Sequence, residues 1–398
     1  MGEGECMNTR ERYRAVMGFR PGVRTLLWEL GYWAGATDRW YEEGLRRGPY
    51  APPTGLPTGS GVIGEALPFP LRPGLVRYRD VDVHSVLGLD DGCVRIPIDW
   101  RANPAFEERI IEEDETTSLM INTQGVKVRV RKDRQSLPQC LDWPVRDHSS
   151  WLQVKEERYS LDISERLPVG WDWLPTSYGQ RDYPLGIIVD GFFGLPRELM
   201  GVEKQLMTYY DDPGLMHEIN AHLCELWLKM LEEVTSKVDL DFVHIWEDMA
   251  FRNGPLISPA MFDEFLLPYY RRIVGMLRQR GVDVILVETD GDCWKLIPGL
   301  LKAGVTGLYP FEGRAGMDIA EVRHHFPSLQ ITGGIDKTVL VAGKEAIDAE
   351  LEHKLPPLLQ TGGFIPHVDH LVPPNVPWEN FRYYREKTRQ YVERYHCQ

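Results

Sequence analysis

Short apolar runs recur along the chain, and each of them ends in polar residues or glycine. Several runs are continuous and rich in β-branched residues, which is typical of strands buried on both faces of a parallel sheet. The runs with this character are Arg24–Leu30, Val94–Asp99, Leu185–Val189, Phe242–Trp246, Val282–Val287, Gly304–Tyr309, Leu329–Thr332 and Gly363–Pro366.

Helical patterns fill the gaps between the later runs. Met216–Val234 has a wide apolar stripe, and Ser258 followed by Pro259 marks the start of another helix, because serine caps a helix N-terminus and proline fits its first position. The remaining helical segments are Trp294–Ala303, Ile319–His325 and Lys344–Leu359. Strands that alternate with helices indicate an α/β barrel or a doubly wound sheet, and eight runs favour a (β/α)8 TIM barrel.

Two segments depart from this repeat. Tyr50–Pro73 is rich in proline and glycine and indicates a long surface excursion. Within Glu112–Pro144 the stretch SLMINTQGVKVRVRK alternates, which predicts a β-hairpin that turns at Gln124 and Gly125. We interpret residues from about 102 to 145 as an insertion after the second strand, and we expect residues 1–398 to form a single domain.

Composition narrows the class of protein. The 43% of hydrophobic residues can form a large core, and 45 basic against 59 acidic residues, with no Lys/Arg-rich run, argue against a nucleic-acid partner. Apolar stretches are too short to span a membrane, and the charged N-terminus does not resemble a signal peptide, so we expect a soluble cytoplasmic protein. The six cysteines are scattered without a C-x-x-C pair, which argues against a disulfide framework or a cysteine-only zinc cluster.

Ionisable residues follow each of the last five predicted strands. In a (β/α)8 barrel these strand ends meet at one face, where active sites lie. The residues concerned are Glu247, Asp248, Glu288, Asp290, Asp292, Glu312, Asp336, Lys337, Asp369 and His370, and Trp246 ends the strand that precedes the first of them. Each has an ordinary alternative: the carboxylates can cap helices, Lys337 can be a solvated surface lysine, and a tryptophan can be core. Together, however, several acids at one mouth require a cation, a basic substrate group or shifted pKa values.

Glu288 and Asp290 form the centre of the expected site. Two positions apart on a strand, they share one face. With His370 from the last strand they would supply two oxygens and one nitrogen, a ligand set that suits Zn²⁺ with an open fourth position and that Mn²⁺ or Fe²⁺ would also accept. The motif is weak by spacing alone, so the metal is a hypothesis.

Several longer segments resemble the uroporphyrinogen decarboxylase superfamily, which includes methyltransferases that act with corrinoid proteins. The segments are GPLISPAMFDEFLLPYY, DGDCWKLIPGLLKAGVTGLYPFE, GGIDK and GGFIPHVDHLVPPNVPWENFRYY. The resemblance implies a (β/α)8 barrel, in agreement with the strand count.

The resemblance also bears on single positions. His370 matches a histidine of the decarboxylases and a cysteine of the zinc methyltransferases, while Glu288 and Asp290 match the His-x-Cys half of the zinc site. The segment TLLWELGYWAG replaces the one in which decarboxylases carry arginines for the porphyrinogen carboxylates, and Gly31 and Gly35 stand at the matching positions. The resemblance therefore favours the methyltransferase-like members over uroporphyrinogen decarboxylase itself.

These observations lead to three hypotheses of different classes. The first is a methyltransferase that moves a methyl group from a small O- or N-methylated compound to a corrinoid carried by a partner protein, with zinc or another divalent metal at Glu288, Asp290 and His370. The second is a metal-free decarboxylase or lyase acting on a different substrate. The third is a binding protein without catalysis.

Roles for the remaining residues follow from the first hypothesis. His370, Glu247 and Asp248 are the candidate catalytic residues. The candidate substrate-binding residues are Trp28, Tyr32, Trp33, Trp246, Asp336, Lys337 and Asp369. The aromatic members would form a wall able to stack a ring or hold a cationic methyl donor.

Overall fold

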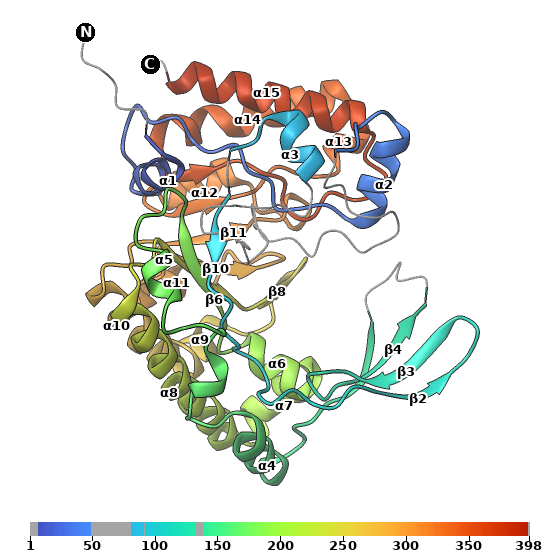
Figure 1. Ribbon diagram of the computed structural model, residues 1–398, viewed down its shortest axis with the longest axis vertical. Coiled ribbons are helices and arrows are strands. Elements are labelled where there is room, and N and C mark those ends of the chain that lie inside the picture. The colour runs from blue at the N-terminus through green and yellow to red at the C-terminus, as the bar shows by residue number, and fades with distance from the viewer. Residues whose placement is uncertain (1–6, 49–80, 91, 133–137, 397–398) are drawn as a thin grey trace.

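A curled parallel sheet organises the protein. The computed structural model describes residues 7–48, 81–90, 92–132 and 138–396 (Figure 1). Its seven-stranded sheet has the order β1-β6-β7-β10-β11-β12-β13, and all of its neighbouring strands are parallel. The strands are β1 (Val94–Arg95), β6 (Leu185–Asp190), β7 (Phe242–Trp246), β10 (Ile285–Thr289), β11 (Gly307–Pro310), β12 (Gln330–Thr332) and β13 (Phe364–Ile365). Strand order equals chain order, as a barrel requires.

The eighth predicted strand, Arg24–Leu30, is not a strand in the structure. Its segment is buried from Thr25 to Tyr32, yet it is tied to its neighbours mainly through side chains. The Thr25 hydroxyl donates to the Phe364 carbonyl in β13 (2.5 Å), and Asp90, just before β1, accepts from the Leu27 amide (2.8 Å). The segment thus contacts both edges of the curled sheet without a backbone ladder, and the prediction of eight paired strands is confirmed for seven.

Helices cover the outside of the sheet (Figure 1). They are α1 (Thr9–Met17), α2 (Ala34–Glu42), α3 (Val81–Leu87), α4 (His148–Arg158), α5 (Leu174–Ser177), α6 (Gly194–Met200), α7 (Val202–Asp211), α8 (Pro213–Lys237), α9 (Pro259–Phe265), α10 (Leu267–Gln279), α11 (Ile297–Ala303), α12 (Ile319–His325), α13 (Val339–Ala342), α14 (Lys344–Thr361) and α15 (Trp378–His396), with 3-10 turns η1 (Ser164–Arg166) and η2 (Gly313–Ala315). All five predicted helices are present, and Ser258 caps α9 by accepting from the Met261 amide (3.2 Å).

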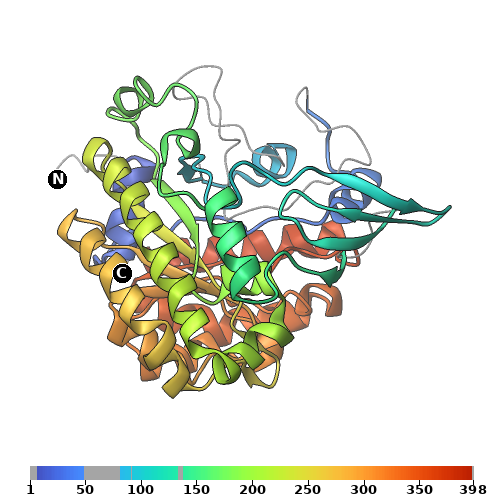
Figure 2. The same cartoon turned by 90° about the horizontal axis from the view of Figure 1, so that it is seen from below.

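The predicted hairpin is part of a larger antiparallel sheet. Strands β2 (Arg109–Glu113), β3 (Thr117–Ile121), β4 (Lys127–Arg131) and β5 (Gln139–Asp142) pair in that order, and the β3–β4 turn contains Gly125 at φ +80°. This sheet follows β1 in the chain and projects from the body of the molecule (Figures 1 and 2). The insertion is therefore confirmed, while the excursion predicted over Tyr50–Pro73 lies outside the described residues.

The two faces of the main sheet bury different sets of side chains. Outward residues such as Val243 and Ile285 join the core beneath the helices. The inward set consists of Phe242, Leu286, Tyr309 and Ile365, and it packs with Tyr13 of α1 and with Trp28. Since β-strand side chains alternate, residues two and four positions further along each strand also face the interior, toward its C-terminal mouth.

None of the helices in the described ranges is long and apolar enough to cross a membrane.

Candidate active site

Two acidic side chains of β10 and its extension lie in the upper interior, by which we mean the part of the barrel interior nearest the C-terminal ends of the strands. Leu286 faces the inner cluster, so Glu288 and Asp290 follow on the same side. Glu288 lies in register with Trp246 of β7 and Tyr309 of β11. The predicted pairing of the two carboxylates is thus present at the mouth.

Burial and mutual repulsion change the acidity of this pair. Burial, and then the charges of Asp290 and Asp248, raise the pKa of Glu288 well above its ordinary value. Burial, and then Glu312 and Asp248, raise the pKa of Asp290 to about 7. A carboxyl group kept protonated near neutral pH can act as a general acid.

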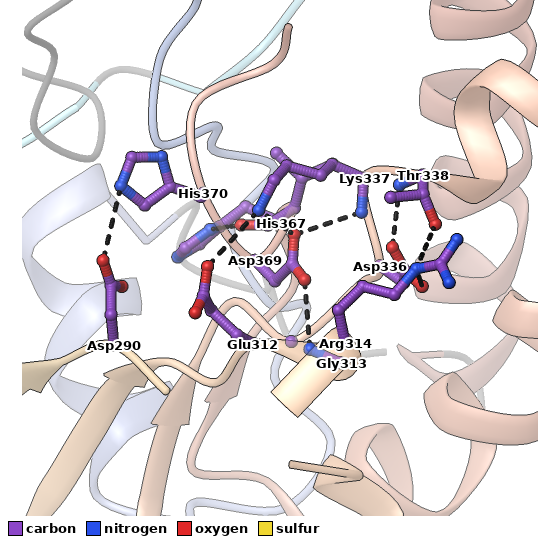
Figure 3. A network of polar contacts seen from close by, with 12 residues as sticks. Asp290, Glu312, Gly313, Arg314, Asp336, Lys337, Thr338, His367, Asp369 and His370 are labelled. Atoms are coloured by element: carbon purple, nitrogen blue, oxygen red, sulfur yellow. Dashed lines mark hydrogen bonds and ion pairs between the residues drawn. The ribbon is translucent and has the colours of Figure 1, made fainter. Parts of the chain in front are cut away.

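His370 stands opposite Asp290. Its Nε2 lies 3.7 Å from Asp290 Oδ2, too long for a hydrogen bond but close enough for a proton relay after a small movement (Figure 3). Burial, and then the charge of Lys337, lower the pKa of His370, which favours a neutral imidazole. The structure therefore places His370 beside Asp290, and Asp290 close enough to Glu288 for their charges to interact.

A second network borders the pair and holds Lys337 (Figure 3). The Lys337 ammonium lies 3.3 Å from Asp369 Oδ1 and 3.5 Å from Glu312 Oε1. The buried Asp369 also accepts from the amides of Gly313 (3.0 Å) and Lys337 (3.1 Å). Asp369 thus fixes the loops after β11 and β12, and Lys337 presents the cation of the network.

Asp336 has a local structural role in this network. Its carboxylate accepts from the Thr338 amide (2.8 Å) and lies 3.5 Å from the Arg314 guanidinium. Its own amide donates to Glu350 (2.8 Å). These contacts favour the ordinary alternative for Asp336, an acid that caps the turn after a strand, over direct substrate binding.

Glu247 turns away from the mouth. Its carboxylate accepts from the amides of Phe192, Phe193 and Gly194 at 2.7–3.0 Å and also from the Tyr270 hydroxyl. A Cβ at Gly191 would lie only 2.0 Å from this carboxylate, so the loop after β6 requires glycine there. Burial raises the pKa of Glu247 to about 7, although the four hydrogen-bond donors act to lower it. The contacts show that Glu247 holds the loop after β6, and its catalytic role stays a prediction.

Asp248 and Trp246 lie at the mouth with two arginines. Asp248 adopts a left-handed backbone (φ +50°) and its carboxylate accepts from Arg197 (2.5 Å). The guanidinium groups of Arg197 and Arg101 lie 5.2 and 5.8 Å from the Trp246 ring centre. An unfavourable φ in a non-glycine residue at a cluster of charges is a common mark of a functional site.

Asp190 and Arg101 are mouth residues that the sequence interpretation missed. Asp190 ends β6, lies in register with Trp246, and accepts from Arg101 Nε at 3.0 Å. Burial raises the pKa of Asp190. The signal for it was available, because an acid directly follows the apolar run Leu185–Val189; Arg101 lies before the insertion and only the fold brings it here.

The predicted aromatic wall is largely absent from the mouth. Trp28 stacks on Tyr13 at 5.5 Å in the inner core, and Tyr32 packs edge-on against Trp40 and Phe381. Both are therefore core residues, the ordinary fate of buried aromatic side chains. Trp33 differs: it is 37% exposed, and its amide donates to the carbonyl of Val372, two residues after His370 (3.1 Å).

Side chains that could bind a metal lie at the mouth, but they are not arranged as a complete set of ligands. Glu288 Oε2 and Asp290 Oδ1 are buried and have no hydrogen-bond partner among the described residues, as free ligand atoms would have none. Within the described ranges, however, no group of three or more His, Cys, Asp or Glu side chains is arranged to hold a metal ion. The zinc site stays a prediction, and no chemical step is assigned to it.

Comparisons with known proteins agree with the resemblance. Uroporphyrinogen decarboxylases of Pseudomonas fluorescens and Thermus thermophilus are 28% and 26% identical over 202 and 223 residues, which cover 48% and 51% of this chain and 53% and 59% of theirs. The chain thus spans about half the length of these relatives. The enzyme of Pseudomonas putida is 30% identical over 263 residues, 58% of this chain and 70% of its own.

A solved structure and a family match complete the comparison. A methyltransferase from Methanosarcina mazei superposes with a TM-score of 0.59 at 16% identity, covering 96% of this chain and 99% of its own, which shows a shared fold. Residues 141–391 match the family described as uroporphyrinogen decarboxylase (URO-D). The chain belongs to the uroporphyrinogen decarboxylase (URO-D) family.

Proposed function

We propose that this member of the family is a methyltransferase that moves a methyl group from a small O- or N-methylated compound to a corrinoid carried by a partner protein. The observation that carries the proposal is the pair Glu288 and Asp290, whose unpartnered carboxyl oxygens face the upper interior. The fold shared with the Methanosarcina mazei methyltransferase supports it.

The charges at the mouth disfavour a substrate with many carboxylates. Gly31 and Gly35 stand where the resemblance expects arginines. Arg101, Arg197 and Lys337, which lie at the mouth, are each in an ion pair with a carboxylate of this chain. An incoming polyanion would have to displace those partners and approach Glu288 and Asp290, so a neutral or cationic substrate fits better.

The carboxyl pair can assist the departure of the methylated atom. As the C–O bond of an O-methyl donor breaks, its electron pair stays on oxygen, and a proton from Glu288 or Asp290 neutralises that oxygen. His370 can return a proton to Asp290 across their 3.7 Å gap. The reduced corrinoid, when bound, supplies the electron pair that receives the methyl group. For an N-methylammonium donor the nitrogen leaves as a neutral amine and needs no proton.

The test is methyl transfer to free cobalamin. The purified chain is mixed with reduced cobalamin and with methanol, methylamines or methoxylated aromatics, and methylcobalamin is followed by its visible absorbance. We expect turnover with at least one donor class and, for an O-methyl donor, a loss of about 100-fold or more in Glu288→Gln, which keeps the size but cannot donate a carboxyl proton. Elemental analysis of the active protein tests the zinc prediction independently.

The decarboxylase alternative keeps support from the family match and from the sequence relatives. It predicts CO2 release from a carboxylic acid substrate that is insensitive to chelators, with His370 and a neighbouring carboxyl as the acid–base groups. CO2 release without methyl transfer from any of the donors would replace the methyltransferase proposal.

A further inference from the structure

The backbone is strained at Phe311, directly after β11. Its φ of +63° lies in the left-handed region, which a bulky residue other than glycine rarely adopts. Strain of this kind persists only where the surrounding structure enforces it, and it is concentrated at functional sites. The residue that this turn places is therefore a candidate for a role at the mouth.

The strained turn exchanges the directions of two side chains. Tyr309 faces the barrel interior, so regular alternation along the strand would direct Phe311 inward and Glu312 outward. Phe311 is instead buried in the core beneath the helices, in the same cluster as the outward residue Leu308. Glu312 reaches the mouth, where its carboxylate contacts the segments that follow β10 and β12. The left-handed turn at Phe311 is thus what brings Glu312 to the site.

Glu312 binds the segment that carries Asp290. Its Oε2 accepts from the amide of Gly291, the residue after Asp290, at 3.1 Å. Gly291 also lies against β8 (Ala250–Phe251), where a Cβ would come within 2.7 Å of the β8 backbone. The Asp292 amide, one residue further on, donates to the Phe251 carbonyl (2.9 Å). The backbone after Asp290 is therefore held between β8 and Glu312.

The other carboxylate oxygen of Glu312 contacts the loop after β12. Oε1 lies 3.5 Å from the Lys337 ammonium, which is itself 3.3 Å from Asp369 (Figure 3). Asp369 directly precedes His370 in the chain. Glu312 is thus linked to the neighbour of Asp290 and, through Lys337, to the neighbour of His370, and these are the two residues that lie 3.7 Å apart.

We infer that Glu312 is a positioning residue, which holds Asp290 in its place opposite His370. This role deepens the proposed function and rests on it for the reaction whose rate depends on that placement. The ordinary alternative is a carboxylate that only stabilises its own loop. Against that alternative, the side chain bonds to Gly291 rather than to the amides of η2, and the strain at Phe311 is maintained to place it there.

The test separates the hydrogen bond to Gly291 from the charge of Glu312. With an O-methyl donor and reduced cobalamin, Glu312→Ala is expected to lower kcat about 10- to 100-fold and to change KM by less than about twofold, because a misplacement of about 1 Å costs that much in rate. Glu312→Gln removes the same charge but keeps an oxygen for the Gly291 amide, and it should restore most of the rate. An unchanged kcat in Glu312→Ala, or no rescue in Glu312→Gln, would overturn the inference.

Asp318→Ala is the matched control. Asp318 lies in the same loop after β11 and also accepts from a backbone amide, that of Ala320 in the first turn of α12 (2.9 Å). Its removal should lower the thermal midpoint by an amount comparable to that in Glu312→Ala and leave kcat unchanged. An equal fall in kcat for both variants would assign the effect to the loop as a whole and contradict the positioning role.

Hydrogen exchange measures the contact independently of activity. The Gly291 amide should exchange about tenfold faster in Glu312→Ala than in the unaltered chain, because it loses its acceptor, and Glu312→Gln should restore most of the protection. Mass spectrometry with fragmentation of the peptides that contain Gly291 provides the measurement. Exchange at Gly291 that is the same in Glu312→Ala and in the unaltered chain contradicts the inference.

The positioning role and the proposed function fail in different ways. Methyl transfer at the same rate in Glu312→Ala and in the unaltered chain keeps the methyltransferase and refutes the positioning role. No methyl transfer from any donor, with exchange at Gly291 that still depends on Glu312, refutes the reaction and keeps the role of Glu312 in holding the segment after β10.

Discussion

Along β10 and the segment that contains β13, the side chains of the lower barrel interior are apolar and those of the upper interior are polar, while the neighbouring strands bury the polar pair Arg95 and His244 at the lower level. In the lower half, Leu286 and Ile365 pack into a cluster with Tyr13 and Trp28. Two positions further along the same two segments lie Glu288 and His367, and each has a buried polar atom that finds no hydrogen-bond partner in the part of the chain that the structure describes. Within two residues, β10 therefore changes from an apolar side chain that packs in the core, Leu286, to a buried carboxyl with an unpaired oxygen, Glu288.

The contrast indicates that the lower half of the interior contributes mainly to stability and the upper half mainly to function. Burying apolar area stabilises the lower half, whereas a buried carboxyl or imidazole without partners costs free energy. Such a cost is expected at sites that bind or react, where the missing partner is supplied by the ligand. Substitutions in the two halves should therefore have opposite effects on folding and on activity.

The largest effect on stability is expected for Leu286→Ala in the lower half. Removing this buried side chain should lower the free energy of unfolding by about 2–5 kcal/mol, through lost transfer energy and a residual cavity. Urea unfolding followed by circular dichroism measures it. Glu288→Gln is the matched control. It should keep or raise the urea midpoint, because it removes a buried carboxyl group that lies near the negative charges of Asp290 and Asp248. Similar losses of unfolding free energy in both variants would show that the two halves do not differ in their contribution to stability.

A pH effect is expected for Asp290 in the upper half. Its pKa is raised to about 7, mainly by burial, so its contribution to stability is complete below the ordinary carboxyl pKa and is lost as the pH rises through about 7. Asp290→Asn should therefore gain stability relative to the unaltered protein between pH 5 and pH 8, on the order of 1 kcal/mol or more. Thermal midpoints of both proteins across this range provide the measurement. A constant difference over the whole range would show that Asp290 has no raised pKa.

The smallest effects are expected for the aromatic residues. Trp28→Phe should change stability by about 1 kcal/mol and leave KM for the substrate unchanged, since Trp28 stacks on Tyr13 in the core. Trp246→Phe should leave stability almost unchanged and raise KM a few-fold, because the guanidinium groups of Arg101 and Arg197 both lie over the Trp246 ring at the mouth. Steady-state kinetics of the two variants measure both KM values. A rise in KM for Trp28→Phe would restore it to the predicted aromatic wall.

Much of the fold could be predicted because parallel strands buried on both faces leave continuous apolar runs. That pattern located the seven paired strands, five of the helices between them and the β3–β4 hairpin. It failed at Arg24–Leu30, where burial is as complete as in a strand but side chains such as Thr25 make the contacts. Hydrophobicity reports burial, and it does not report which groups make the hydrogen bonds.

For the site, the sequence determined that acids and histidines end consecutive strands, and barrel topology then required Glu288, Asp290 and His370 to converge. Only the tertiary structure decided which of these residues face the interior. It gave Glu247 four donors from a loop and a neighbouring helix, and it left Nε2 of His367 without a partner. The physical reason is that a side chain's role depends on its hydrogen-bond partners, and partners far apart in the chain are brought together only by folding.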